Sequence, residues 1–293
     1  MARDLIEQDR EGLDAVLEAE TILGLPLRGL MAQGPEDALR RTENAQPAIV
    51  LHSLLLLRRL AGAGVKPDAV AGHSLGEFAG LHAAQALDWV GTLQAVGARG
   101  RAMALAAPSG TGMAAVLGLP DQRVEAVLAQ AAGSETVVAA NYNAPGQVVV
   151  SGSDEGLERV IPALQSAGAR RVVRLEVSGA FHSPFMAGAA AAFRPAWEAI
   201  PLRRPACIQV FNADAAAHQE PAEIRELMIR QLTGPVRWRG RVDRLWELGV
   251  RTFLEVGPGR TLSALVKKIQ PAASTHNVQD RPSLDAFLQA VHA

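Results

Sequence analysis

A serine with a glycine two residues away on either side, in Gly72-His73-Ser74-Leu75-Gly76, is the clearest candidate for chemistry in this sequence. A short apolar stretch (68–71) precedes it, and a helix-forming run of small residues (75–86) follows at once. Gly-x-Ser-x-Gly between a strand and a helix is the nucleophile-elbow pattern, in which a sharp turn lifts the serine hydroxyl clear of the sheet. In a chain rich in glycine and alanine, a chance match is the alternative.

The same turn would stabilise negative charge that develops beside Ser74. The N-terminus of the following helix has free N–H groups and carries the positive end of the helix dipole. The backbone N–H of Leu75 is the natural first donor to such an oxyanion. We expect Gly72 and Gly76 to lie where the backbone passes too close for a side chain.

A serine nucleophile needs a general base, and the chain contains seven histidines. None has a metal-binding spacing such as His-Glu-x-x-His, so we expect no metal site. His182 lies in a loop (178–186) between two predicted units, where a cleft would place a base. A single loop histidine is more often an ordinary surface or core residue, so this choice stays open from the residues alone.

Composition limits the class of protein. The 293 residues are 48% hydrophobic and 20% charged, which is typical of a soluble globular chain with a full core. The net charge of −1 provides no general basic field for nucleic acid. Cys207 is the only cysteine, which excludes an internal disulfide and fits the cytoplasm. The N-terminus lacks a signal-peptide pattern, and the longest apolar run (54–57) cannot span a bilayer.

The order of predicted elements indicates how the candidate residues are positioned. Residues 107–178 read as strand, helix, strand, strand, helix and strand, the ferredoxin-like order. On both sides of this insert, helices alternate with short apolar strands, which favours a mainly parallel sheet covered on both faces. Strands are expected at 68–71, 113–117, 136–140, 147–151, 171–177, 207–211, 251–256 and 276–279. Helices are expected at 1–20, 35–41, 46–60 with Pro47 in its first turn, 75–86, 89–105 capped by Asp88, 120–132, 154–167, 221–232, 239–248, 260–269 and 283–291.

Six stretches of the sequence together resemble a known family: 72–77, 99–103, 141–152, 180–183, 230–236 and 255–259. They resemble the malonyl-CoA:acyl carrier protein transacylases and the related acyltransferase domains of polyketide synthases. They occur in the family's order from about residue 34 to the C-terminus. The resemblance implies an α/β fold, with a hydrolase-like large subdomain (1–106 and 179–293) and an inserted ferredoxin-like small subdomain (107–178).

The resemblance also implies roles for individual residues. Ser74 would carry the acyl group, with Leu75 N–H as oxyanion donor. His182 would act first as base and then as acid toward the departing thiol. In the family a backbone carbonyl, which matches Gln231 here, orients the histidine in place of a triad aspartate.

Arg99 matches the arginine that pairs with the malonyl carboxylate, a task suited to a planar guanidinium. From the residues alone it would be a helix-surface arginine. Phe181 stands where malonyl-selective members crowd out an α-methyl branch, a preference worth about 1–3 kcal/mol. His73, Asn143 and Gln147 match positions beside the substrate, although turn and strand-edge chemistry explains the last two equally well.

One departure concerns the start of the chain. The family begins with a strand and a Gly-Gln-Gly-Ser-Gln turn, whose first glutamine donates the second oxyanion hydrogen bond. This sequence begins at the helix expected next, so the Leu75 N–H has no matching partner. Losing one donor costs about 10²–10³ in rate, and losing a core strand exposes a sheet edge. Either the natural protein extends upstream of Met1, or the chain is short and impaired.

We therefore expect a malonyltransferase that works by a ping-pong mechanism through a malonyl-serine ester. Its partners would be malonyl-CoA and an acyl carrier protein, with no cofactor, nucleic acid or membrane, and we expect a monomer. A hydrolase of acyl thioesters or esters is one alternative, against which Arg99 argues. A non-catalytic carrier-protein-binding module is another, with a basic surface formed by Arg170, Arg171, Arg174, Lys267 and Lys268. The sequence does not distinguish fatty acid from polyketide synthesis.

Overall fold

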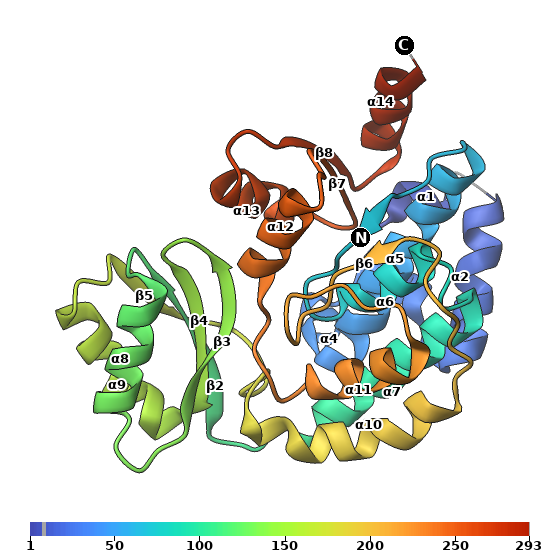
Figure 1. The fold of residues 1–293 in the computed structure, drawn as a ribbon. Coiled ribbons are helices and arrows are strands. Elements are labelled where there is room, and N and C mark those ends of the chain that lie inside the picture. The colour runs from blue at the N-terminus through green and yellow to red at the C-terminus, as the bar shows by residue number, and fades with distance from the viewer. Residues whose placement is uncertain (8–9, 293) are drawn as a thin grey trace.

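The computed structural model describes residues 1–7 and 10–292, and its elements form two lobes that lie side by side in Figure 1. The smaller lobe comprises residues 111–174. Its four strands form one antiparallel sheet in the order β3-β4-β2-β5, the arrangement expected of a ferredoxin-like unit. Its elements are β2 (Thr111–Leu117), α8 (Asp121–Ala131), β3 (Val137–Ala144), β4 (Gln147–Ser153), α9 (Asp154–Ser166) and β5 (Arg171–Arg174).

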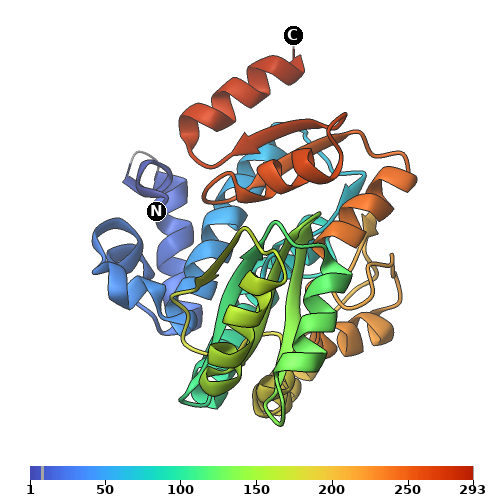
Figure 2. The ribbon, with the colours of Figure 1, turned by 90° about the vertical axis from the view of Figure 1, so that its left-hand side faces the viewer.

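The two helices of the smaller lobe cover one face of its sheet, as Figure 2 shows from that side. Side chains alternate between the faces of a strand, so Val148 and Val150 of β4 point into the core beneath the helices. Val149 points to the opposite face and packs with Met113 and Phe181. That face is turned toward the larger lobe.

The larger lobe contains two parallel pairs of strands, β1 with β6 and β7 with β8, among many helices. Before the insert it comprises α1 (Arg3–Glu7), α2 (Arg10–Leu23), α3 (Leu27–Gln33), α4 (Glu36–Arg40), α5 (Thr42–Gly62), β1 (Ala69–Val70), α6 (Gly76–Ala83) and α7 (Trp89–Ala106). After the insert follow a 3₁₀ turn, η1 (Pro184–Met186), and α10 (Ala187–Ala199), β6 (Ile208–Gln209), α11 (Pro221–Arg230), α12 (Trp238–Glu247), β7 (Thr252–Val256), α13 (Thr261–Ile269), β8 (Ser274–Val278) and α14 (Arg281–His292).

Local sequence explains where the helix that carries Arg99 begins. Asp88 caps α7, because its side chain accepts a hydrogen bond from Gly91 N at 2.7 Å. Such a cap satisfies an N–H group that has no partner within the helix. The expected cap and helix are therefore confirmed.

Three expectations about helices were wrong. Residues 1–20 do not form one helix, because α1 packs against α2: a Cβ on Gly12 would lie 1.9 Å from Leu5 O. Helix α5 begins at Thr42, so Pro47 lies inside it rather than in its first turn. Helix α10, whose buried side chains include Phe193 and Trp197, was not expected from the sequence.

The two lobes are joined by hydrogen bonds as well as by the connecting chain. Tyr142 N of β3 donates to Val236 O at 2.9 Å, and Val236 N donates to Ala140 O at 2.8 Å. Strand β3 is longer than the strand expected at 136–140, because it continues to Ala144. Asn143 is thereby held on the edge strand that faces the larger lobe. Within the described ranges, no helix has the length and apolar character needed to cross a membrane.

Candidate active site

Ser74 lies on a tight turn between β1 and α6, in a backbone conformation that few side chains adopt. Its φ angle is 50°, in the left-handed region that costs a non-glycine residue free energy. Gly72 is required by this turn, because a Cβ there would lie 2.0 Å from Gly76 C. Gly76 itself has no such restriction, since its Cβ would meet nothing within 4 Å. The expectation that both glycines relieve a close approach was therefore wrong for Gly76.

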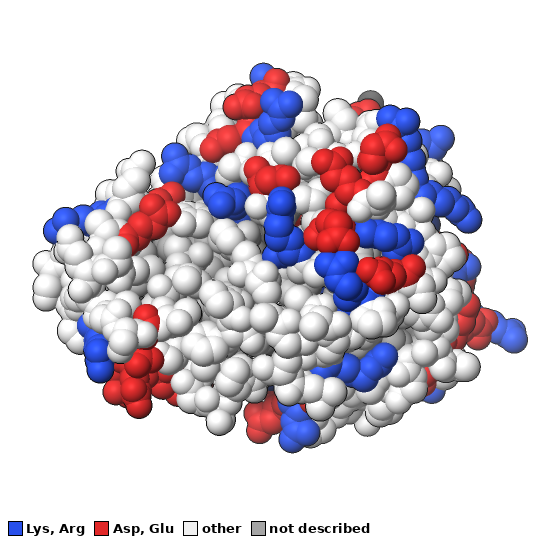
Figure 3. All heavy atoms as spheres, turned by 60° about the horizontal axis from the view of Figure 1, so that its bottom comes forward, with Lys and Arg blue, Asp and Glu red and all other residues white. Residues whose placement is uncertain are grey.

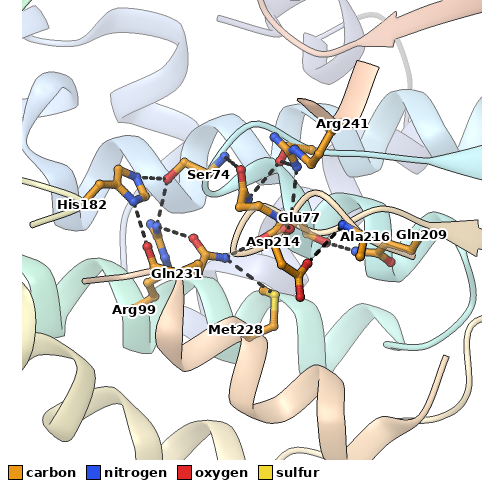
Figure 4. Close-up of polar contacts among 12 residues, drawn as sticks. Ser74, Glu77, Arg99, His182, Gln209, Asp214, Ala216, Met228, Gln231 and Arg241 are labelled. Carbon is orange, nitrogen blue, oxygen red and sulfur yellow. Dashed lines mark hydrogen bonds and ion pairs between the residues drawn. The ribbon is translucent and has the colours of Figure 1, made fainter. Parts of the chain in front are cut away.

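The side chains of Ser74 and His182 meet, although 108 residues separate them along the chain. Ser74 Oγ lies 2.7 Å from His182 Nε2, and His182 Nδ1 lies 2.8 Å from the backbone oxygen of Gln231 (Figure 4). The Gln231 oxygen can only accept, so Nδ1 carries the hydrogen. Neutral His182 thus presents the lone pair of Nε2 to the serine hydroxyl.

Burial keeps the His182 imidazole neutral. It lowers the pKa of His182 to about 3, and the nearby Arg99 guanidinium adds to the effect. A buried cation without a counter-charge is costly, which is why the neutral form is favoured. His182 is therefore available as a proton acceptor across the physiological pH range.

Arg99 is buried beside the serine and not on a helix surface. One terminal nitrogen, Nη2, donates to Ser74 Oγ at 2.9 Å and lies 3.2 Å from Gln231 Oε1. The other, Nη1, donates to Gln46 Oε1 at 2.5 Å. Within the described part of the chain, Arg99 Nε has no hydrogen-bond partner and no carboxylate lies within ion-pair distance of the guanidinium. Burial lowers the pKa of Arg99 to about 10, so it stays charged.

A second layer of buried polar groups lies behind these residues. Glu77 of α6 accepts hydrogen bonds from Gln231 Nε2 and from Asn212 N, both at 2.6 Å. Arg241 of α12 lies 3.6 Å from Glu77 Oε1 and donates to Gly72 O at 2.6 Å. Among the Asp, Glu, Lys and Arg side chains that the structure describes, only Glu77, Arg99 and Arg241 are buried. The two arginines and one glutamate leave an excess of one positive charge.

The other predicted site residues surround this centre at different distances. Leu75 N–H has no acceptor within the described residues, so it is free to donate to a ligand. His73 Nε2 bonds to Asn143 Oδ1 at 2.9 Å, which joins the elbow to β3. Burial lowers the pKa of His73 to about 4. Phe181 is half-buried, next to His182 in the chain. Gln147 lies further out, where its side chain is 3.5 Å from Lys268 Nζ.

Four residues that hold the site together were not expected from the sequence. Gln46 contacts Arg99, and Asn212 contacts the elbow. Arg241 pairs with Glu77. Only Glu77 had a sequence signal, because it follows the Gly-x-Ser-x-Gly pattern directly. The other three belong to elements far away in sequence.

No group of three or more metal-ligating side chains occurs in residues 1–7 and 10–292.

A serine on an elbow, a histidine bonded to it and a buried guanidinium beside both define a protein of the serine acyltransferase and hydrolase class. Comparison with known proteins narrows this class. The family described as "Acyl transferase domain" matches residues 1–284. The malonyl CoA-acyl carrier protein transacylase of Bacillus subtilis is 36% identical over 293 residues, which cover 99% of this chain and 92% of the relative.

Solved structures give the same result. One is a type II polyketide synthase acyl-carrier protein in complex with its malonyl-transacylase, with a TM-score of 0.95 and 36% identity; the match covers 99% of this chain and 94% of that one. Another is an acyl carrier protein S-malonyltransferase from Vibrio cholerae, with a TM-score of 0.93 and 35% identity, covering 98% and 94%. The chain belongs to the acyl transferase domain family, among relatives named malonyl CoA-acyl carrier protein transacylases.

Proposed function

We propose that this protein transfers the malonyl group of malonyl-CoA to the phosphopantetheine thiol of an acyl carrier protein. The observation that carries the proposal is the buried Arg99, which faces Ser74 Oγ and has only neutral oxygen atoms as partners. A buried charge is stable when it is paired. The free carboxylate of a malonyl group supplies the missing counter-charge, and a simple acyl group does not.

In the first step, Ser74 Oγ attacks the thioester carbonyl while His182 Nε2 takes the hydroxyl proton. The carbonyl oxygen becomes an oxyanion that accepts a hydrogen bond from Leu75 N–H. When the C–S bond breaks, His182 returns the proton to the departing CoA thiolate. The products are free CoA and a malonyl ester on Ser74.

In the second step the thiol of the carrier protein, and not water, attacks the malonyl ester on Ser74. His182 removes the thiol proton, and the thiolate attacks the ester carbonyl. The ester C–O bond then breaks, the proton passes to Ser74 Oγ, and the malonyl group leaves as a thioester of the carrier. Gln231 O holds the imidazole for both steps through Nδ1. Arg99 keeps the malonyl group aligned, which favours transfer between fixed partners. The chemistry uses protein groups alone, namely side chains together with the backbone Leu75 N–H and Gln231 O, and needs no cofactor.

The carrier protein would approach the side on which the two lobes meet. Lys268 of α13 reaches Gln147 of β4 there, and Arg170 and Arg171 are exposed on the smaller lobe. Figure 3 shows the molecule from below, where acidic and basic side chains are mixed in the upper part and along the edges of a broad uncharged area. Exposed Lys and Arg side chains suit the acidic surface of a carrier protein.

Intact-protein mass spectrometry after incubation with malonyl-CoA tests the proposal. We expect one malonyl adduct on Ser74, no adduct on the Ser74→Ala variant, and an unchanged adduct on Ser109→Ala, which alters an exposed loop serine. Addition of pantetheine as a minimal thiol acceptor should then yield malonyl-pantetheine in excess of free malonate. No adduct on the folded wild-type protein would refute malonyl transfer, and release mainly as malonate would favour a hydrolase.

A further inference from the structure

Glu77 is a buried carboxylate to which the proposed reaction assigns no role. Its side chain is 1% exposed, and its hydrogen bonds go to Asn212 and Gln231 rather than to Ser74 or His182. Placing a carboxylate inside a protein costs free energy unless hydrogen bonds and a counter-charge compensate for it. Arg241 supplies the counter-charge at 3.6 Å. The remaining contact, with Gln231, connects Glu77 to the reacting groups.

Gln231 contacts three functional groups at once, as Figure 4 shows. Its backbone oxygen accepts from His182 Nδ1 at 2.8 Å, and its side-chain Oε1 accepts from Arg99 Nη2 at 3.2 Å. Its side-chain Nε2 donates to Glu77 Oε2 at 2.6 Å. The backbone of Gln231 therefore orients the base, and its side chain orients the cation.

Only one orientation of the Gln231 amide satisfies both of its neighbours. An ionised carboxylate can only accept, and a guanidinium can only donate. If the amide turned over, its NH₂ group would face the donors of Arg99 and its oxygen would face the oxygens of Glu77. Glu77 thus holds the amide oxygen toward Arg99.

A second amide oxygen holds Arg99 from the other side. Gln46 Oε1 accepts from Arg99 Nη1 at 2.5 Å, and Gln46 Nε2 is bonded to Thr42 Oγ1 at 2.8 Å. Each glutamine is thus held by an acceptor on its NH₂ end, which leaves its oxygen for the guanidinium. The two amide oxygens fix where Arg99 lies relative to Ser74.

We propose that Glu77 is a positioning residue that sets the preference for acyl groups with a free carboxylate, because it fixes the Gln231 amide and thereby the Arg99 guanidinium. The inference rests on the proposed function, since it concerns how the malonyl carboxylate is recognised. A neutral acyl group, such as acetyl, has nothing for Arg99 to bind. Loss of the Glu77 contact should therefore slow malonyl loading and spare acetyl loading, whereas a merely structural role would lower both.

Single-turnover acylation of Ser74 by malonyl-CoA and by acetyl-CoA tests this difference. In Glu77→Gln, an NH₂ group must face either Asn212 N or Gln231 Nε2, both of which are donors. We expect the second-order rate constant for malonyl-CoA to fall about 10- to 100-fold, which is the range for loss of one charge-assisted hydrogen bond. This decrease should come mostly from a higher half-saturation concentration for malonyl-CoA. The second-order rate constant for acetyl-CoA should change by less than about threefold.

A second variant separates the amide from the backbone carbonyl. Gln231→Met keeps the backbone oxygen that holds His182 and removes the contacts with Arg99 and Glu77. It should lose the malonyl preference to a similar degree. If Glu77 acts through this amide, the double variant should be no worse than the stronger single variant, since coupled effects are not additive. Glu226→Gln is the matched control, because Glu226 is an exposed carboxylate that pairs with Arg194.

The outcomes are distinguishable. A wild-type protein that takes no malonyl group onto Ser74 overturns the proposed function and the inference with it. If the wild-type protein does take up the malonyl group, two results overturn only the role of Glu77. One is a malonyl-to-acetyl ratio that is retained in both variants, and the other is additive losses in the double variant. Should Glu77→Gln fail to fold, the Gln231→Met variant decides, because a retained ratio there refutes the positioning role.

Discussion

The guanidinium of Arg99 is the most unusual group of the site, because its hydrogen bonds go to oxygen atoms that carry no charge. They are the Ser74 hydroxyl and the amide oxygens of Gln46 and Gln231. Glu77, the nearest buried carboxylate, is separated from Arg99 by the Gln231 side chain. A dicarboxylic acyl group would therefore bind next to a cation that is already dehydrated and already oriented, which reduces the free-energy cost of binding.

The ionisation of Glu77 gives a pH-dependent test at this scale. Burial raises the pKa of Glu77 to about 7, while the positive charges of Arg241 and Arg99 act in the opposite direction. Protonation adds a donor, so the Gln231 amide loses its fixed orientation as the pH falls through 7. His182 stays neutral over this range because its pKa is about 3. We expect the malonyl-to-acetyl ratio of Ser74 acylation to fall up to about tenfold from pH 8 to pH 6.

The control for this profile is Glu77→Gln, which has no titrating group at the position and should show a flat ratio. A ratio in the wild type that does not change between pH 8 and pH 6 would contradict the assignment. Equal losses of malonyl and acetyl loading would instead indicate titration of the base.

Two elements fix the position of the nucleophile. The turn between β1 and α6 aims Ser74, and α12 holds the turn from behind through Arg241, whose Nη1 donates to Gly72 O. Arg241 also lies over the Trp238 ring, 4.8 Å from its centroid, which favours the cation in this apolar setting. The elbow therefore depends on close backbone packing within the turn and on a charged contact from outside it.

Substitution of the two elbow glycines tests the contribution of close backbone packing. Gly72→Ala places a Cβ 2.0 Å from backbone atoms that cannot move aside, so we expect a loss of at least about 3 kcal/mol in the free energy of unfolding. Gly76→Ala meets no atom within 4 Å and lies at the start of a helix. It should change stability by less than about 1 kcal/mol. Urea unfolding followed by circular dichroism measures both, and equal losses would refute the assigned roles of the glycines.

At the scale of the whole molecule, the site is assembled between two lobes. His182 lies just after the chain returns from the smaller lobe, and Asn143 of that lobe bonds to His73 beside the nucleophile. Hydrogen bonds between β3 and Val236 fasten the smaller lobe to the segment that follows Gln231. The boundaries of the smaller unit at residues 107 and 178 remain a prediction.

Buried neutral histidines make the folded protein sensitive to acid. The folded pKa values of His73 and His182 are about 4 and 3, below the ordinary histidine value of 6.5. As the pH falls below 6.5, the unfolded chain binds protons that the folded chain does not, so stability is lost on acidification. Between pH 6.5 and pH 5 each histidine should cost about 1.6 kcal/mol. Glu77, whose pKa is raised, acts in the opposite direction.

A comparison of variants isolates the histidine effect. Urea unfolding at pH 6.5 and pH 5 should show that the double variant His73→Gln, His182→Gln loses about 3 kcal/mol less stability than the wild type on acidification. The contribution of Glu77 is common to both proteins and cancels in first approximation. Identical losses in the two proteins would show that these imidazoles are not held neutral by the fold.

The sequence by itself determined the features that depend on local pattern. The elbow around Ser74, the cap at Asp88 and the order of strands and helices in the smaller lobe each follow from neighbouring residue types. Backbone conformation and capping involve residues only a few positions apart, which is why such patterns predict them. The single helix expected for residues 1–20 was wrong because apolar spacing does not reveal where a helix packs back on another.

Only the tertiary structure decided which polar groups are buried together. Ser74 and His182 are 108 residues apart, and Glu77 and Gln231 are 154 residues apart. The sequence of α12 reads as an ordinary charged helix, and nothing in it marks Arg241 as fully buried. Whether an arginine is solvated or desolvated depends on what the rest of the chain packs over it. The electrostatics of the site, with its one excess positive charge, therefore arise from packing and not from any local motif.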